Sequence, residues 1–278
     1  MSFVTTETST QLAIDTAAQR LIAAAGDLKS CVPVRDVLGA QDITSAYAVQ
    51  QILTERAIAE GQRIVGRKIG LTSPAVQRQL GVDQPDFGVL FDGMQRSQHV
   101  AVVTASLLQP KGEAEIAFVL SADLVDADVD LVGIRRSIGY AVAALEIVDS
   151  RISNWDITIV DTIADNGSSA LYVLGDRHIE LDDLDLATIT MTLDEDGVEV
   201  SSGSGAACLG DPLIALQWLA RTAIEYGQPL LAGQTVLSGA LGPMVPVRAG
   251  STYVAQLSNF GEVSVQFDSS VNPEGHQR

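Results

Sequence analysis

The stretch that decides the fold of this chain is Gln109-Pro110-Lys111-Gly112-Glu113-Ala114-Glu115-Ile116-Ala117-Phe118-Val119-Leu120. The residues after Gly112 have the apolar and β-branched content of a strand, in which side chains alternate between two faces. One face is apolar and belongs in a core: Ala114, Ile116, Phe118 and Leu120. Glu113 and Glu115 project from the opposite face, about 7 Å apart along the strand. Such a pair can share one hard divalent cation, or it can simply lie on the solvent-exposed face of an edge strand.

A second strand adds a third carboxylate. The run from Tyr140 to Asp149 is apolar on both faces, which is typical of a buried strand, and it contains Glu146. An unpaired buried carboxylate costs several kcal/mol or more, so Glu146 requires a partner. That partner could be Arg151 or Lys68 in a salt bridge, or it could be a cation. Three carboxylates on two strands favour a hard-metal site over a salt-bridge network.

The composition limits the classes of function. With 278 residues, 46% of them hydrophobic, the chain can bury a sizeable core as one large domain or two small ones. A formal net charge of −18 argues against nucleic-acid or anionic-membrane partners. No secretory signal and no membrane span is visible. Cys31 and Cys208 belong to no C-x-x-C pattern, so a cytoplasmic protein with idle thiols is expected.

The N-terminal quarter is expected to be helical. Apolar residues at helical spacing predict a helix from Thr10 to Gly26 and another from Thr44 to Glu60, together forming a cap or lid. The strand predicted at Arg63–Gly70 carries glycines on both sides of Lys68, a pattern that often marks close approach of a ligand or of another backbone.

The rest of the chain alternates turns with short strands. The segment Gly81–Gly88 is rich in acids, proline and glycine and is expected to be a loop, in which Asp83 and Asp86 are turn formers on composition alone. Asp196-Gly197 between two short strands is a strong hairpin signal. Helices in front and many short strands behind them predict an α+β protein with a mixed or antiparallel sheet curled on itself.

Several motifs, in this order along the chain, carry a resemblance to a known family. They are Val65-Gly66-Arg67-Lys68-Ile69-Gly70-Leu71-Thr72, Gly81-Val82-Asp83-Gln84-Pro85-Asp86-Phe87-Gly88, Glu113-Ala114-Glu115-Ile116-Ala117 and Gly239-Ala240-Leu241-Gly242-Pro243-Met244. From about residue 12 to 267 the chain resembles the 2-keto-4-pentenoate (2-hydroxypenta-2,4-dienoate) hydratases. These enzymes form part of the hydratase/decarboxylase branch of the fumarylacetoacetate hydrolase superfamily.

The resemblance implies a fold, a metal and a reaction. From the residues themselves we expect a helical cap over residues 1–62 that does not fold independently and a flexible tail over 268–278. The resemblance implies a β-roll catalytic core over 63–267. It also implies a Mg²⁺ or Mn²⁺ site made by Glu113, Glu115 and Glu146. The implied reaction adds water to 2-hydroxypenta-2,4-dienoate, giving 4-hydroxy-2-oxopentanoate, in the degradation of aromatic rings after meta-cleavage. The implied assembly is a homo-oligomer, which can associate with a pathway aldolase or decarboxylase.

The residues fit this chemistry. A substrate carboxylate and its 2-oxygen can chelate a metal that polarises the oxygen. Lys68 is the expected cation beside the charge that develops on that oxygen, and Asp86, with Asp83 as its rival, is the expected acid/base. Lys111 stands where members of the family often have arginine. Ser204 and Ala207 lie in a loop that is usually more polar.

Alternatives remain open on the sequence. A hydrolase that cleaves carbon–carbon bonds would use an N-terminal His–Glu pair, but the first histidine of this chain is His99. 4-Oxalocrotonate decarboxylases and hydratases of diacid 2-oxo-enoates share nearly the same motifs. A non-catalytic partner subunit of a hydratase/decarboxylase complex is a further alternative, although such a subunit would need neither the three acids nor Lys68.

Substrate length can also be predicted. The far end of the pocket is expected to be lined by the lid helices, by Phe87 to Leu90 and by Leu237 to Met244. The last two segments contain no lysine or arginine, so a second substrate carboxylate would lack a partner and a five-carbon monoacid is favoured. The lid helices contain four cations that could reach the far end of the pocket: Arg20, Lys29, Arg35 and Arg56.

Overall fold

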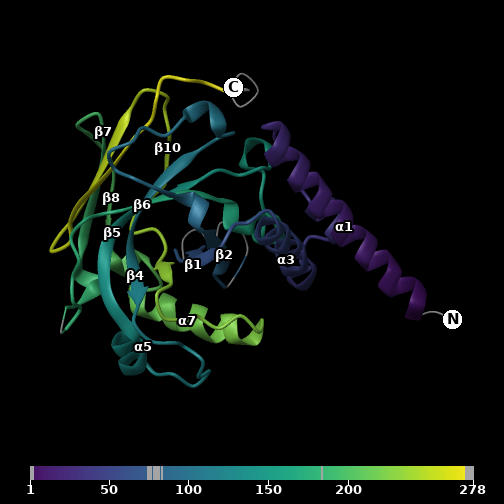
Figure 1. Cartoon of the computed structure of the whole chain (residues 1–278), viewed down its shortest axis with the longest axis horizontal. Helices are drawn as coiled ribbons and strands as arrows, with labels where there is room; N and C mark the ends of the chain where they lie inside the picture. The colour runs from purple at the N-terminus through teal and green to yellow at the C-terminus, as the bar shows by residue number, and fades with distance from the viewer. Residues whose placement is uncertain (1–2, 74–76, 78–81, 83, 183, 273–278) are drawn as a thin grey trace.

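Two β-sheets form the body of the molecule (Figure 1). The computed structural model describes residues 3–73, 77, 82, 84–182 and 184–272. The larger sheet has the strand order β2-β1-β9-β4-β5-β6-β3, with β10 paired to β4, and the smaller one has the order β12-β11-β7-β8. The larger sheet mixes parallel pairs, such as β1 with β9, and antiparallel pairs. The predicted α+β class with a mixed sheet is confirmed.

The strand bounds are as follows. The larger sheet consists of β1 (Ile64–Gly70), β2 (Asp86–Phe91), β3 (Gln95–Arg96), β4 (Lys111–Leu120), β5 (Ile138–Val148), β6 (Ser169–Leu174), β9 (Thr235–Leu237) and β10 (Val245–Pro246). The smaller sheet consists of β7 (Thr190–Glu195), β8 (Val198–Ser204), β11 (Thr252–Leu257) and β12 (Gly261–Gln266).

The long antiparallel pair β4–β5 separates two cores. Side chains alternate across each strand, so one face of the pair joins the main hydrophobic core through residues such as Ile116 and Leu145. The other face contributes Ala117 and Val142 to a smaller core. The same face carries the three glutamates, beyond the end of that smaller core. The predicted apolar face of β4 is therefore confirmed, since all four of its residues are buried.

Over the residues that the structure describes, the helix bounds are α1 (Phe3–Asp27), α2 (Arg35–Leu38), α3 (Ile43–Ala59), α5 (Leu131–Ser137), α6 (Ile159–Ala164) and α7 (Pro212–Glu225). Asp42 begins α3, because its carboxylate accepts a hydrogen bond from the Ser45 amide at 3.0 Å. Asp211 begins α7 in the same way, followed by Pro212 in the first turn, where a missing N–H costs nothing. In Figure 1, α1 and α3 lie on the side of the molecule away from β7 and β8.

Several local predictions can be compared with the structure. The hairpin at Asp196-Gly197 is confirmed, with φ of 50° and 82° at the two turn residues joining β7 to β8. The loop predicted over residues 81–88 is partly wrong, because Asp86, Phe87 and Gly88 belong to β2, paired with β1. Local composition favoured a turn, but tertiary strand pairing overrides it. The division of the chain at residues 62 and 267 stays a prediction.

Candidate active site

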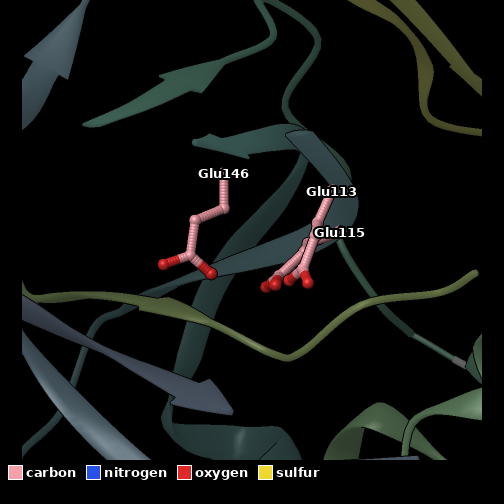
Figure 2. Close-up of side chains that lie close together, drawn as sticks. All are labelled: Glu113, Glu115 and Glu146. Carbon is pink, nitrogen blue, oxygen red and sulfur yellow. The ribbon is translucent and has the colours of Figure 1, made fainter. Parts of the chain in front are cut away.

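Three glutamates converge from two neighbouring strands. Glu113 and Glu115 point from one face of β4, and Glu146 on β5 is the direct cross-strand partner of Glu113. One carboxylate oxygen from each lies within 4.8 Å of the other two (Figure 2). Glu115 and Glu146 are buried, while Glu113 is partly exposed. The spacing suits three ligands around one ion.

Most of these carboxylate oxygens lack hydrogen bonds. The amide of Gly239 donates to Glu115 Oε2 at 2.8 Å. Among the described residues, Glu115 Oε1 and both oxygens of Glu146 have no hydrogen-bond partner, although Lys68 Nζ lies 3.3 Å from Glu146 Oε1 as an ion pair. Buried polar atoms are nearly always paired, so these orphaned acceptors leave room for a positively charged ligand. The donor set, three carboxylates with open positions, fits a hard divalent cation.

The electrostatics of the cluster lead to the same conclusion. Burial, and then the charge of Glu146, raises the pKa of Glu113 to about 7. Burial, followed by the charges of the other two acids, raises the pKa of Glu115 well above its usual value. Burial likewise raises the pKa of Glu146, against the opposing effect of Lys68. Like charges this close disfavour simultaneous ionisation, and a divalent cation would remove that penalty.

Lys68 projects from β1 into the same space. Burial opposes its charge, but the carboxylates of Glu146 and Asp86 outweigh burial and raise its pKa. The lysine therefore remains an ammonium. Gly167, with φ of +61°, leaves the space through which the lysine stem passes, since a Cβ there would lie 3.1 Å from Lys68 Cδ.

Asp86 is the first residue of β2 and pairs with Gly70 of β1. A Cβ on Gly70 would lie 2.1 Å from Asp86 Oδ1, so only glycine allows the carboxyl group to occupy this position. The glycine pattern around Lys68 did indicate close approach, as predicted. Burial raises the pKa of Asp86, with Lys68 and the Thr162 hydroxyl acting in the opposite direction. Asp83 lies outside the described residues.

Lys68, Asp86 and Glu113 border a cavity of about 320 Å³. That volume is at the small end of the roughly 300–1,000 Å³ that ligand pockets span. Its other polar lining side chains are Thr72, Ser73, Thr162 and Ser168. Its larger apolar lining residues are Ile69, Leu71, Val148, Trp155, Ile157, Pro243 and Met244.

The prediction of which segments line the cavity is partly wrong. The described residues of α1, α2 and α3 contribute nothing to the cavity wall, so these helices are not a lid over it. Phe87 points away and stacks on Tyr47 of α3, with ring centroids 4.7 Å apart, because alternate residues of β2 face opposite sides. Leu237 and Leu241 are buried in the cores, whereas Gly242, Pro243 and Met244 do line the cavity.

Three of the four expected lid cations form salt bridges away from the cavity. Arg20 pairs with Asp36, Arg35 with Asp156 and Asp161, and Arg56 with Glu60. Of the two salt-bridge partners considered for Glu146, Lys68 is the one found, since Arg151 binds Asp165. Ala207 lines the cavity and Ser204 does not.

Sequence reasoning missed Trp155, Ile157 and Thr162. The first two lie in and just after a short 3-10 turn at Ser153–Trp155, and Thr162 lies in α6. No periodicity or motif marks them, because their approach to the cavity depends on how the chain returns after β5.

Within the described part of the chain, no helix combines the length and apolar character needed to cross a membrane.

Comparison with known proteins places this geometry in context. Residues 64–268 match the family described as fumarylacetoacetate (FAA) hydrolase C-terminal. The chain is 51% identical to a TodF product hydratase of Pseudomonas putida, over 92% of this chain and 95% of that protein. It is 52% identical to a 2-keto-4-pentenoate hydratase of Burkholderia vietnamiensis, over 90% and 95% respectively.

A solved structure has the same fold over nearly the whole chain. It is that of a 4-oxalocrotonate decarboxylase from Pseudomonas putida G7 complexed with magnesium and adipate. The TM-score is 0.88 at 32% identity, covering 93% of this chain and 98% of that one. The resemblance and the roll-like fold predicted from sequence are thereby confirmed.

Proposed function

The chain belongs to the fumarylacetoacetate hydrolase family, and we propose that it is a metal-dependent hydratase that converts 2-hydroxypenta-2,4-dienoate into 4-hydroxy-2-oxopentanoate. The observation that carries this proposal is the convergence of Glu113, Glu115 and Glu146 beside a small cavity, with Glu113 in the cavity wall and unpaired oxygens on Glu115 and Glu146. The hydratases named above share 51% and 52% identity with this chain, which supports the reaction type.

The three glutamates would hold a Mg²⁺ or Mn²⁺ ion. Such an ion acts as a Lewis acid toward the oxygen on carbon two of a bound 2-oxo or 2-hydroxy acid. The solved decarboxylase that was crystallised with magnesium supports the choice of a hard cation. Among the described residues the cluster consists of carboxylates alone, which also favours Mg²⁺ or Mn²⁺.

Lys68 and Asp86 supply the remaining chemistry. The Lys68 ammonium stabilises negative charge that returns to the oxygen on carbon two while water adds to carbon four. Asp86, buried beside Lys68 with a raised pKa, transfers protons between the substrate carbons and water. Both side chains line the cavity, so they meet the requirement of proximity to a bound substrate.

Two alternatives are less well supported. A 4-oxalocrotonate decarboxylase would use the same site, but the solved decarboxylase is 32% identical to this chain, well below the hydratases. A non-catalytic partner subunit would have no need for three converging acids and a buried lysine. A homo-oligomer in the cytoplasm, with an aldolase or decarboxylase as partner, stays a prediction.

The deciding experiment strips the purified chain of metal and refills it. Without metal, neither substrate should be consumed, and Mg²⁺ or Mn²⁺ should restore hydration of the dienol. Faster consumption of 4-oxalocrotonate with release of carbon dioxide would make the protein a decarboxylase. Full activity in excess chelator would overturn the metal site, and no activity on either substrate would favour the partner-subunit alternative.

Single variants test the two proposed roles. Lys68→Met should lower kcat more than it weakens metal binding, because the ammonium matters most when charge develops. Asp86→Asn should slow deuterium exchange into the substrate carbons, by about 100-fold if it is the acid/base. If Asp83→Asn abolishes that exchange and Asp86→Asn does not, Asp83 takes the role.

A further inference from the structure

A second lysine lies at the edge of the same cavity. Lys111, Glu113 and Glu115 occupy alternate positions of β4, so Lys111 belongs to the face that carries the glutamates. Its direct cross-strand neighbour on β5 is Val148, which lines the cavity. Lys111 is therefore bordered by Glu113 and Val148, two residues of the cavity wall.

The ammonium of Lys111 rests on an aromatic face. Its Nζ lies 4.2 Å from the centroid of the Trp155 ring, and Trp155 also lines the cavity. Within the described chain this ammonium forms no ion pair. An ammonium over an indole is held in place by the ring quadrupole, yet its charge remains available to an anion. Partial burial lowers the pKa of Lys111, with Glu113 opposing that effect.

The backbone conformation and hydrogen bonds of the loop that carries Trp155 fix the position of its ring. Asn154 and Trp155 have φ of 60° and 54°, two consecutive non-glycine residues in the left-handed region. Such a conformation is sparsely populated and persists only where its surroundings impose it. The indole Nε1 donates to the carbonyl of Gln109 at 2.9 Å, and the Gln109 side chain donates to the carbonyl of Ser150 at 2.8 Å. Gln109 thus fixes the loop on which the ammonium of Lys111 rests.

The two cations of the site differ in their partners. Lys68 lies among carboxylates, with Glu146 at 3.3 Å, so its charge is already compensated inside the cavity. Lys111 has an aromatic partner and, among the described residues, forms no salt bridge, although Glu113 is near enough to raise its pKa. An incoming anion also approaches a chain with a formal net charge of −18, which repels it on average. A free positive charge at the edge of the cavity would reverse that repulsion locally.

We propose that Lys111, held on Trp155, is a specificity-determining residue that recognises the carboxylate of the substrate and selects anionic 2-oxo acids over neutral analogues. This inference rests on the proposed function for the substrate class. The carboxylate is bound beside Glu113, where the metal would lie, and the carbon chain extends along the rest of the cavity. Lys111 acts on the affinity for the anion and leaves proton transfer to other residues.

Binding of a non-reacting analogue tests the proposal without depending on turnover. The probe is 2-oxopentanoate, which has the carboxylate and the 2-oxygen but no double bond to hydrate. Calorimetry on the full chain with saturating Mg²⁺ should give a Kd raised about tenfold in Lys111→Met and restored to within about threefold in Lys111→Arg. The neutral methyl ester of 2-oxopentanoate should bind both variants as it binds the unmodified chain, because it carries no charge for Lys111 to recognise.

Two further variants separate charge from packing. Arg56→Gln removes the same unit charge from a surface pair on α3 and should leave the Kd of 2-oxopentanoate unchanged. Trp155→Leu should weaken binding of the acid and spare the ester, as Lys111→Met does. For the unmodified chain the Kd should rise with added salt more steeply than for Lys111→Met.

Three outcomes would overturn the proposal. They are an unchanged Kd for the acid in Lys111→Met, an equal loss for the acid and the ester, and an equal loss in Arg56→Gln. If the unmodified chain shows the Lys111-dependent binding but hydrates no dienol, the hydratase assignment fails and the carboxylate site stands. If the unmodified chain hydrates the dienol but Lys111→Met leaves the Kd of the acid unchanged, the hydratase assignment stands and the role of Lys111 fails.

Discussion

Asp161 and Glu115 are equally buried, but only Asp161 is fully hydrogen-bonded. Both have 0% of their surface exposed. Asp161 accepts five hydrogen bonds, from the amides of Val34, Arg35 and Thr158, the Thr158 hydroxyl and the Arg35 guanidinium, at 2.6–3.0 Å. Glu115 accepts one, from Gly239, and its other oxygen has no hydrogen-bond partner among the described residues.

The difference separates an acid that protein groups neutralise from acids that the described protein groups leave largely unpaired. Asp161 joins α2 to α6, and its charge is neutralised by protein groups alone. The glutamates oppose one another, and nothing in the described chain neutralises all three. Burying charge without partners is strongly disfavoured, so such a cluster is explained by a ligand and not by stability. Burial alone would have grouped the two kinds of acid together.

The largest expected effect comes from Glu115→Gln. Removal of one ligand charge should lower Mg²⁺-dependent turnover by at least about a thousandfold, or roughly 4 kcal/mol of transition-state stabilisation. The metal-free variant should be at least as stable as the unmodified protein at neutral pH, because one repulsive charge is gone.

Turnover assays together with urea unfolding in chelator would check both halves of this expectation. Glu60→Gln, at an exposed glutamate on the surface of the molecule, is the matched control and should change neither quantity. Mg²⁺-dependent stabilisation that persists unchanged in Glu115→Gln would remove this residue from the metal site.

Asp161→Asn should show the opposite pattern. Breaking a buried ion pair by changing one partner typically costs about 3–5 kcal/mol, and the part-exposed Arg35 places the expected cost near 3 kcal/mol. Chemical denaturation would measure it, and Mg²⁺ affinity should be unchanged in the folded variant.

The second salt bridge of Arg35, with Asp156, provides a control. Asp156→Asn changes its second carboxylate partner, whose side chain is 64% exposed, and should cost less than about 1 kcal/mol. If both variants cost the same, burial has no part in the strength of this ion-pair network.

The sequence was sufficient to predict the paired glutamates and not the shape of the cavity. Strand periodicity placed Glu113 and Glu115 on one face, and the apolar run around Glu146 marked a buried carboxylate that needed a partner. Register could not be inferred, yet register sets Glu146 opposite Glu113 and Asp86 opposite Gly70. Strand pairing depends on tertiary contacts that no local pattern encodes.

The error about the lid has a similar cause. The periodic patterns of α1 and α3 correctly predicted helices with an apolar face but could not say which surface that face covers. In the structure α3 packs near α6 and β2, and Gln50 donates to the carbonyls of Phe87 and Ile163 at 2.9 and 3.0 Å. The helix thereby supports the strand that carries Asp86 and does not cover the substrate.

The glutamate cluster should also make the stability of the metal-free protein depend on pH. Glu113 keeps its proton in the folded, metal-free protein up to a pKa of about 7, whereas in the unfolded chain it loses it near 4.5. The folded state therefore binds more protons between these values, and the metal-free protein should lose stability as pH rises from about 4.5 through 7. The loss should be on the order of 1–2 kcal/mol, since the partial exposure of Glu113 screens its charge.

Thermal melting in chelator across pH 5–8 would measure this slope, and Mg²⁺ should stabilise more at pH 8 than at pH 5.5, because carboxylates bind metal when deprotonated. Glu113→Gln should flatten the slope. A metal-free protein that gains stability from pH 5 to 8 would contradict the raised pKa of Glu113.

The last expected effect concerns a charge that the substrate itself brings into the cavity. A diacid such as 4-oxalocrotonate carries a second carboxylate, which would be buried like Glu115 and would need partners like those of Asp161. Lys68 is the one cation among the described lining residues, and Glu146 already engages it. The specificity constant for the five-carbon dienol should therefore exceed that for any diacid by at least about tenfold, or roughly 1.4 kcal/mol. Side-by-side kinetics on both substrates would measure the ratio. A ratio near one would mean that the second carboxylate does find a partner in the cavity.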